Sequence, residues 1–410
     1  MKPLLLFDLD NTLLYNDINF FLGAYLQALG KHLSTRIAPE KMVPLLLAGT
    51  DKMIKKEMPA QTLEETFDQA FYPAMGIPKE DLAEEIRNFY EEIYPGLVSL
   101  TRTRPEAIQL IDFAFQNDYP VVIATNPLFP LKAILHRLEW AGIPVEKYPY
   151  QLVTTYETFH FAKPNPAYYA EILAQLGWRE RAALMIGDSL EDDIIPASQI
   201  GIAGYFVTDQ PVCLPEGIHN YSSQGSLDKV LSWIKATGER EGKRGRQSAQ
   251  GMVSILKSTP AVLETLSSCQ DERIWQERPA ANEWCLAEIV AHLRDVDREV
   301  NLPRLKKVCL EDNPYLQSVD TDPWANERKY ILENGLSARQ DFLTVRTKLL
   351  EMISALSEID WQRPACHAIF GPTNVRELVS NIATHDQLHF RQIFATIHSL
   401  KGPFGTNFRN

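Results

Sequence analysis

An apolar run that ends directly in acidic residues constrains this chain more than any other feature of its sequence. Residues 4–7 read Leu-Leu-Leu-Phe, and Asp8 and Asp10 follow at once, with the hydroxyl of Thr12 next. A short, continuous apolar run is typical of a strand that is buried on both faces of a parallel sheet. In such sheets ligands bind at the carboxyl ends of the strands. Two carboxylates at that end need a cation, and Mg²⁺, which prefers oxygen ligands, fits them.

The length and composition indicate several folded domains and exclude some classes of partner. The chain has 410 residues and a formal net charge of −12. This length suggests two or three domains, and the acidic balance argues against a general binder of nucleic acid or of anionic membranes. The five cysteines form no C-x-x-C pair, which is typical of reduced intracellular thiols. Because Asp8 and Asp10 interrupt the apolar run, it is neither a signal sequence nor a membrane span. We therefore expect a cytoplasmic protein.

The order of elements in the first half predicts a parallel α/β core with a helical insertion. Residues 17–95 carry only helical patterns, so this block is expected to cover the end of the first strand. Helices are then predicted at 105–117, 130–141, 166–177, 191–200 and 227–236, alternating with strands at 121–124, 152–154, 183–186 and 205–207. Such alternation is typical of a parallel sheet with helices on both faces. The core is thus expected to comprise 1–16 and 96–236.

The second half is predicted to be a separate all-helical domain. Residues 237–251 are rich in glycine and charge and contain no large apolar residue, so they are interpreted as a linker rather than as a nucleic-acid patch. Helices are predicted at 253–268, 283–311, 336–356 and 374–400, and no convincing strand is found after Val253. This pattern favours an antiparallel four-helix bundle over 252–402, followed by a tail at 403–410.

Polar residues suited to phosphoryl chemistry follow the later strands of the α/β half as well. Thr125 and Asn126 come after one strand, Lys163 after the next, and Asp188 and Asp193 after a third. A hydroxyl and an amide can bind phosphoryl oxygens, a lysine can offset their charge, and carboxylates can complete a Mg²⁺ shell. An acid after one strand is often only a helix N-cap, so the inference depends on the whole set.

The segments DLDNTL, ATN, KP and GDSLEDD, in this order, resemble the four motifs of the haloacid-dehalogenase superfamily over about residues 1–235. The resemblance implies that Asp8 is a nucleophile that forms an aspartyl-phosphate and that Asp10 is the general acid and base. An acid at the position of Asp10 is found in the phosphatases of the family and not in its dehalogenases. Phosphoryl transfer is therefore favoured over cleavage of a carbon–halogen bond.

The same resemblance implies roles for the other strand-end residues. Thr125 and Asn126 would bind the phosphoryl group, and Lys163 would stabilise its charge and that of the nucleophile. Mg²⁺ would be held by the Asp8 side chain, the Asp10 carbonyl and Asp188. Asp193 is assigned to the second acidic position of the last motif, and Asp192 is the alternative to it. Residues 17–95 match the helical cap of the family, so the choice of substrate should lie there. A scaffold that only binds is the alternative, but no core residue is missing.

Three histidines in the second half form another candidate site. His385 and His389 are four residues apart on the apolar side of a helix that opens with the capping pair Asn374 and Glu377. This is the spacing at which one helix gives two nitrogen ligands to a metal. His292 lies at the edge of the apolar stripe of another helix. A lone histidine there is more often a core residue, but the pair makes a three-histidine metal site the better account.

Residues 253–402 resemble the DinB/YfiT-like superfamily of metal-binding four-helix bundles. The resemblance rests on the segments PAANEW (279–284), IVAHLRD (289–295), LEDNP (310–314), DPW (322–324) and HDQLHFRQ (385–392). It implies a divalent ion, Zn²⁺, Ni²⁺ or Fe²⁺, and in some members a thiol-dependent transfer or isomerisation. Three neutral nitrogens suit zinc or nickel equally. Cys285 and Cys309 lie nearby in sequence and are expected to serve packing.

These features predict a Mg²⁺-dependent phosphatase that acts on a small phosphorylated metabolite and is fused to a metal-binding bundle. One alternative makes the bundle the principal enzyme, a metal-dependent thiol transferase or detoxification enzyme. Another makes it a non-catalytic module for interaction, through which the chain could form a homodimer. The sequence leaves the substrate, the metal of the bundle and the coupling of the two sites open.

Overall fold

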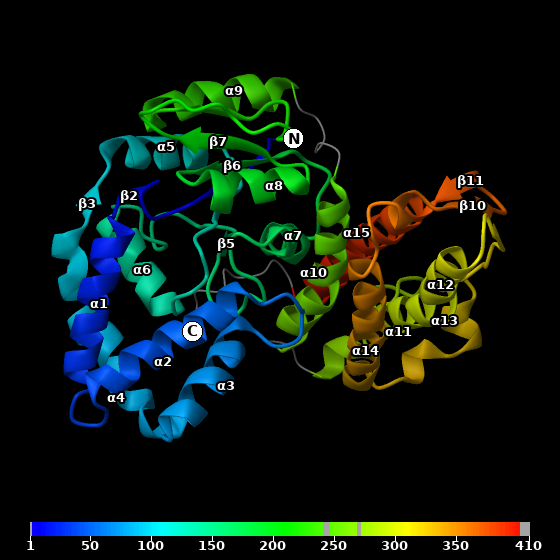
Figure 1. Cartoon of the computed structure of the whole chain (residues 1–410), viewed down its shortest axis with the longest axis horizontal. Coiled ribbons are helices and arrows are strands. Elements are labelled where there is room, and N and C mark those ends of the chain that lie inside the picture. Colours follow the sequence, from blue (N-terminus) through cyan, green and yellow to red (C-terminus); the bar gives the residue numbers. More distant parts are fainter. Residues whose placement is uncertain (1, 241–246, 269–271, 402–410) are drawn as a thin grey trace.

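The computed structural model describes residues 2–240, 247–268 and 272–401, and its first half is built on one parallel sheet (Figure 1). The strands of this sheet are β1 (Leu4–Phe7), β4 (Val121–Ile123), β5 (Leu152–Val153), β6 (Ala183–Gly187), β7 (Ala203–Val207) and β8 (Ser223–Gly225). The helices of this half are α5 (Pro105–Gln116), α6 (Leu131–Trp140), α7 (Pro166–Gln175), α8 (Ile195–Gln199) and α9 (Val230–Arg240). The alternation predicted from the sequence is thus confirmed, whereas β8 was not predicted.

The strand order places β1 in the middle of the sheet. The order is β5-β4-β1-β6-β7-β8, and every neighbouring pair is parallel. The chain adds β4 and β5 on one side of β1 and then crosses to the other side for β6. In open parallel sheets such a switch point opens a crevice at the carboxyl ends of the strands. The end of β1 is therefore where a site is expected.

The first strand is buried on both faces, as its unbroken apolar sequence predicts. Leu5 and Phe7 face the layer formed by α5, α6 and α9, whereas Leu4 and Leu6 belong to the core on the face of α7 and α8. All four side chains are at most 3% exposed. Alternating side chains of one strand thus anchor both layers, which fixes where the strand and its acidic end lie.

A helical cap is inserted between β1 and the rest of the core. It contains α1 (Ile18–His32), α2 (Pro39–Ile54), α3 (Leu63–Met75) and α4 (Ala83–Asn88), which form the blue group at one side of the sheet in Figure 1. Two short strands, β2 (Leu14–Tyr15) and β3 (Arg102–Thr103), pair antiparallel where the chain leaves and re-enters the core. The cap is also tied to the core further along, since the Leu63 amide donates to the Phe159 carbonyl at 2.8 Å.

The C-terminal half consists mainly of long helices. They are α10 (Ala249–Ser268), α11 (Leu286–Val296), α12 (Leu302–Leu310), α13 (Trp324–Glu327), α14 (Gly335–Ser354) and α15 (Val375–Lys401), and a π-helical turn (Asp297–Asn301) joins α11 to α12. The Asn374 side chain accepts from the Glu377 amide at 2.9 Å, so it caps α15 as expected. Among the described residues, we find no helix whose length and hydropathy would let it cross a lipid bilayer.

The prediction that no strand follows Val253 is wrong. Three short strands, β9 (Tyr315–Leu316), β10 (Pro364–His367) and β11 (Gly371–Asn374), form a small sheet in the order β11-β10-β9. Strands of two to four residues are too short to show an alternating pattern, and two of them contain proline, which argues against a strand. The half is therefore a helical bundle with a small sheet rather than all-helical.

The bundle packs directly on the α/β core. Of the linker expected at 237–251, α9 takes up the start, α10 begins at Ala249, and 241–246 lie outside the described residues, as does the tail at 403–410. The Ser248 amide donates to the Gln199 carbonyl at 2.9 Å, and a Cβ on Gly251 would lie 2.0 Å from that same oxygen. Helix α10 covers α7, all ten residues of which are buried between it and the sheet. This contact fixes the placement of the two halves.

Candidate functional sites

Three carboxylates meet at the carboxyl ends of β1 and β6. The Asp8 amide donates to the Ile186 carbonyl at 2.9 Å, so Asp8 is the first residue beyond the paired part of β1. Asp188 follows β6 directly, and Asp193 lies in the π-helical turn Leu190–Ile194 that comes next. One oxygen of each carboxylate lies within 4.8 Å of the others. The predicted convergence of these three strand-end acids is therefore present.

Lys163 lies between two of these carboxylates. Its Nζ is 2.7 Å from Asp8 Oδ1 and 2.6 Å from Asp193 Oδ1, and the side chain is 2% exposed. Its backbone amide donates to Asn126 Oδ1 at 3.2 Å, which ties the loop after β5 to the loop after β4. One buried cation thus orients both acids.

The cluster carries more negative than positive charge. Burial raises the pKa of Asp8 well above its ordinary value against the opposing effect of Lys163, and burial and the charge of Asp193 raise the pKa of Asp188 to about 6. Three carboxylates and one ammonium leave a deficit of positive charge, which a divalent cation would relieve. The donors are all hard oxygens, as Mg²⁺ prefers, so the residues fit that ion.

Asp193, rather than its neighbour Asp192, joins the cluster. A Cβ on Gly187 would lie 2.2 Å from Asp193 Oδ2, so the glycine at the end of β6 lets this carboxylate approach the strand. The Ser189 amide donates to the same oxygen at 3.1 Å. Asp192 is only partly buried, and its backbone carbonyl accepts from the hydroxyl of Tyr169 at 2.7 Å.

Asp10 has two partners, and the sequence analysis named neither of them. Asn16 Nδ2 donates to Asp10 Oδ1 at 2.7 Å, and the guanidinium of Arg137 on α6 forms an ion pair with Asp10 Oδ2. Arg137 is 1% exposed, and its Nε and Nη2 have no hydrogen-bond partner among the described residues. A signal was present: Arg137 falls on the same face of α6 as the buried Ile134 and Leu138, where an arginine is not expected unless it is paired.

Two hydrogen bonds to the Thr125 carbonyl hold the loop after β4 in place. The Thr125 carbonyl accepts from the hydroxyl of Tyr168 at 2.8 Å and from Thr154 Oγ1 at 2.6 Å. Thr125 and Asn126 line the same cavity as Asp8, as their predicted role in binding a phosphoryl group requires. This cavity has a volume of about 500 Å³ and extends from the acidic cluster between the helices of the cap.

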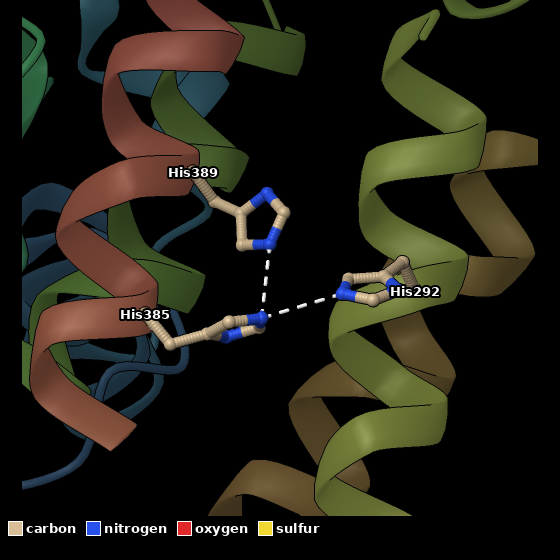
Figure 2. A group of neighbouring side chains, drawn as sticks. All are labelled: His292, His385 and His389. Atoms are coloured by element: carbon tan, nitrogen blue, oxygen red, sulfur yellow. Dashed lines mark hydrogen bonds between the residues drawn. The ribbon is translucent and has the colours of Figure 1, made fainter. Parts of the chain in front are cut away.

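The three predicted histidines also meet. His385 and His389 project from α15 and His292 from α11, with all three rings pointing toward one another (Figure 2). The Nε2 atom of His385 is 3.3 Å from that of His292 and 3.2 Å from that of His389. Nitrogens bound at 2.0–2.1 Å to one tetrahedral zinc would be roughly 3.3 Å apart, so the spacing fits a shared metal.

The imidazoles are in the protonation state that binds a metal. Burial, and then the neighbouring rings, lower the pKa of His292 and His385 to about 3, so both are neutral at pH 7. His389 Nδ1 lies 2.9 Å from the Gln392 side-chain oxygen and donates to it, which leaves the lone pair on Nε2. A hydrogen bond of this kind fixes the tautomer of a ligating histidine. Three neutral nitrogens fit Zn²⁺, Ni²⁺ or Fe²⁺.

Buried contacts hold the helices that carry these rings. Arg346 on α14 pairs with Asp386, the residue after His385, and its Nε donates to Asp297 at 2.6 Å. The ring of Trp284 lies 5.0 Å from that of His292, centroid to centroid, and nearly parallel to that of His389. The site is thus rigidly framed on two sides.

Of the two nearby thiols, Cys285 packs in the core as expected, whereas Cys309 is only partly buried. Cys285 is fully buried and caps the start of α11, where burial raises the pKa of its thiol to about 11. Burial also raises the pKa of Cys309. Both are therefore thiols at neutral pH and poor nucleophiles.

Comparison with known proteins separates the two halves. Residues 3–201 match the family model described as haloacid dehalogenase-like hydrolase, and residues 255–393 match that of the DinB superfamily. The chain is 25% identical over 253 residues to a phosphoglycolate phosphatase from Rhodospirillum rubrum, covering 59% of this chain and 96% of that protein. It is 26% identical over 150 residues to the uncharacterized protein YuaE of Bacillus subtilis, covering 32% and 90%. Among solved structures, the four-helix bundle protein YfiT of Bacillus subtilis shares 14% identity with a TM-score of 0.35, covering 38% of this chain and 93% of YfiT.

Proposed function

This chain joins a haloacid dehalogenase-like hydrolase to a member of the DinB superfamily, and we propose that the hydrolase is a Mg²⁺-dependent phosphatase of a small phosphorylated metabolite. The observation that carries the proposal is the position of the Lys163 ammonium, 2.7 Å from Asp8 and 2.6 Å from Asp193 at the end of the central strand. A lysine so placed orients a carboxylate nucleophile and offsets the charge of a bound phosphoryl group. The similarity to a phosphoglycolate phosphatase supports the same class of reaction.

Each residue of the cluster has a role in this reaction. An oxygen of Asp8 attacks phosphorus to give an aspartyl-phosphate, and the bond between phosphorus and the leaving oxygen breaks. Asp10 gives that oxygen a proton and later takes one from the water that hydrolyses the intermediate. Arg137 and Asn16 hold Asp10 in place for both steps.

The remaining residues bind the phosphoryl group and the metal. Thr125 and Asn126 donate to phosphoryl oxygens from the loop after β4. The side chains of Asp8, Asp188 and Asp193, with the Asp10 carbonyl, would hold Mg²⁺. When bound, the ion neutralises charge on the carboxylates and on the phosphoryl oxygens.

The test is phosphate release with Mg²⁺ across a panel of phosphorylated compounds, comparing wild type with Asp8→Asn. We expect Asp8→Asn to keep its fold, because it is isosteric, and to lose at least about a thousandfold in kcat. Asp112→Asn, an identical change on the surface of α5, is the matched control and should retain full activity. Undiminished activity in folded Asp8→Asn would refute the role of Asp8.

A second function is favoured by the three converging imidazoles. We infer that the C-terminal bundle binds one divalent transition-metal ion through His292, His385 and His389. The alternative to a phosphatase is that this bundle, rather than the α/β half, is the principal enzyme and acts as a metal-dependent thiol transferase or detoxification enzyme. The thiols of Cys285 and Cys309 are poor nucleophiles because the pKa of each is raised, so an exogenous thiol would be needed. Thiol consumption that persists in Asp8→Asn and stops in His385→Ala would support this alternative.

The bundle could instead serve association. Its direct packing on the core removes the flexible tether on which a tethering role depends, so association would take the form of a homodimer through the outer face of the bundle. Light scattering of the full chain addresses it, since a strict monomer at micromolar concentration would eliminate the dimer.

A further inference from the structure

The cavity that begins at the acidic cluster continues far into the cap. On α1, the residues Ile18, Leu22, Tyr25 and Leu29 recur every three or four positions and line it. From Ile18 to Leu29 this stripe runs roughly 16 Å along the helix axis, at 1.5 Å per residue. On α2, a stripe from Met42 to Met53 lines the cavity over a similar length. A phosphoryl group and a two-carbon acid would occupy only one end of such a space.

The part of the cavity within the cap has few polar groups to offer a ligand. The hydroxyls of Tyr25 and Tyr90 bond to each other at 2.9 Å, and Thr50 Oγ1 donates to the backbone within α2. Asp68 is paired with Lys79 at 2.6 Å. Tyr72 is the other polar side chain of cap helices α1–α4 that lines the cavity.

The positive charges lie at one end. Of the described residues that line the cavity, the cations are Lys163 and Arg137, and both come from the core. Each is already next to a carboxylate, Asp8 and Asp10 respectively. A carboxylate or second phosphate reaching into the cap would therefore find no cation, and a sugar would leave its hydroxyls against leucine and methionine side chains.

We propose that the substrate is a monoester of phosphate with a long apolar group, whose phosphate lies at Asp8 and whose apolar part fills the cavity between α1 and α2. The proposal rests on the phosphatase function above and specifies its substrate class. Hydrolysis breaks the bond between phosphorus and the ester oxygen, water supplies the oxygen that ends on phosphate, and the apolar alcohol leaves with a proton from Asp10. The cavity volume of about 500 Å³ lies within the range of sites that enclose molecules of drug size.

The decisive measurement is kcat/KM for methyl, butyl, octyl and dodecyl phosphate, with phosphoglycolate and glucose 6-phosphate as small polar substrates. Burial of each methylene should raise kcat/KM about fourfold, or roughly two-hundredfold from butyl to octyl phosphate. Values that stay flat or fall with chain length, while a small polar compound is hydrolysed well, would overturn the proposal and leave the phosphatase function standing.

Binding separates the two proposals if no compound is hydrolysed. Calorimetric titration with the matching alkylphosphonates, which cannot be hydrolysed, should give a Kd that falls about fourfold per methylene. Tighter binding of longer phosphonates without any hydrolysis of the phosphates would refute the phosphatase and retain the apolar site. No dependence of Kd on chain length would refute the site itself.

A variant of the cap tests whether the apolar group of the substrate binds between the cap helices. Leu29→Trp should shorten the cavity and lower kcat/KM for dodecyl phosphate at least tenfold, with little change for methyl phosphate. Phe20→Trp is the matched control, because Phe20 lies on the same helix, is 64% exposed and does not line the cavity. An equal loss for both substrates in folded Leu29→Trp would contradict the placement, and the alkyl series in wild type decides the substrate class even if this variant fails to fold.

Discussion

The two candidate sites differ in their electrostatics, since one is rich in negative charge and the other is neutral. At the end of β1, three carboxylates, of which Asp8 and Asp193 are buried, cluster around one ammonium, and burial raises the pKa of Asp8 and Asp188. In the bundle, three largely buried imidazoles carry no charge, because desolvation lowers the pKa of each below its ordinary value. The first site disfavours its own ionised form until a cation is present, whereas the second is already in its ligating form. We infer that a metal compensates charge in the first site and bridges neutral ligands in the second.

Removing Lys163 should have the largest effect on stability and activity among the changes that test this comparison. Lys163→Met leaves Asp8 and Asp193 buried without their partner, which should lower the free energy of unfolding by about 3–5 kcal/mol and abolish phosphate release. Urea unfolding and a phosphate assay measure the two effects. Lys147→Met, at an exposed lysine of the same half, should change neither, and a stable, active Lys163→Met would break the electrostatic account.

Removing a histidine should weaken metal binding and leave the first site intact. His385→Ala should lower the affinity for Zn²⁺ at least about a hundredfold, because a direct ligand matters more than the outer partners whose loss costs 10–100-fold. Metal content after dialysis measures this, with His398→Ala on the same helix as the control. Unchanged stoichiometry in His385→Ala would remove the basis of the histidine site.

Metal removal should distinguish the sites in the wild-type protein. At a free concentration about a hundred times its Kd, an ion that binds only the folded state adds about 2.7 kcal/mol to the free energy of unfolding. Mg²⁺ should give this increase to wild type but not to Asp188→Asn, and Zn²⁺ to wild type but not to His389→Ala. Thermal unfolding after chelation and re-addition of each ion tests both pairs, and protection by Mg²⁺ that survives in Asp188→Asn would contradict the assignment.

A hydrogen-bonded network between the α/β half and the bundle should have a smaller effect on the free energy of unfolding, and this effect should depend on pH. His160 Nδ1 is 2.8 Å from Glu171 on α7, and its Nε2 is 3.3 Å from Glu264 on α10. Burial alone would lower the pKa of His160, but the charge of Glu171 and the hydrogen bonds to both glutamates raise it above the ordinary value. The stabilisation is therefore complete below about pH 6.5 and is lost as pH rises through the raised pKa.

The measurement is the free energy of unfolding from pH 6 upward. In wild type it should fall by up to about 1.4 kcal/mol per pH unit on account of this group. His160→Gln should remove that part of the slope, whereas His32→Gln in the cap should leave it. Identical slopes in wild type and His160→Gln would show that the network does not titrate.

The sequence predicted both clusters because each depends on a regular spacing. Parallel strands bring their carboxyl ends to one edge, so Asp8 and Asp188 meet once the topology is recognised. Residues four apart on a helix share a face, so His385 and His389 had to lie together. Arg137 escaped prediction because a charged residue within an amphipathic helix is normally assigned to its exposed face.

Other features depend on tertiary packing rather than on local pattern. The strands β8 to β11 are too short to impose alternation. The cavity in the cap arises from how α1 and α2 face each other, although each shows only an ordinary apolar stripe. The contact of α10 with α7 could not be predicted from the glycine-rich segment between the halves. The composition of that segment indicates a boundary between domains, but it does not indicate whether the domains contact each other.

Helix α7 has a consequence for any attempt to divide the protein. Its outer face is covered by α10, and Gly177 and Trp178 just beyond it pack against Phe394 and Phe390 of α15. A polypeptide that ended at Arg240 would expose this apolar face to water, and we expect it to aggregate or to bind the separate C-terminal half. The two halves should therefore fold and remain monomeric only as one polypeptide, and we expect neither half to be stable when it is produced alone.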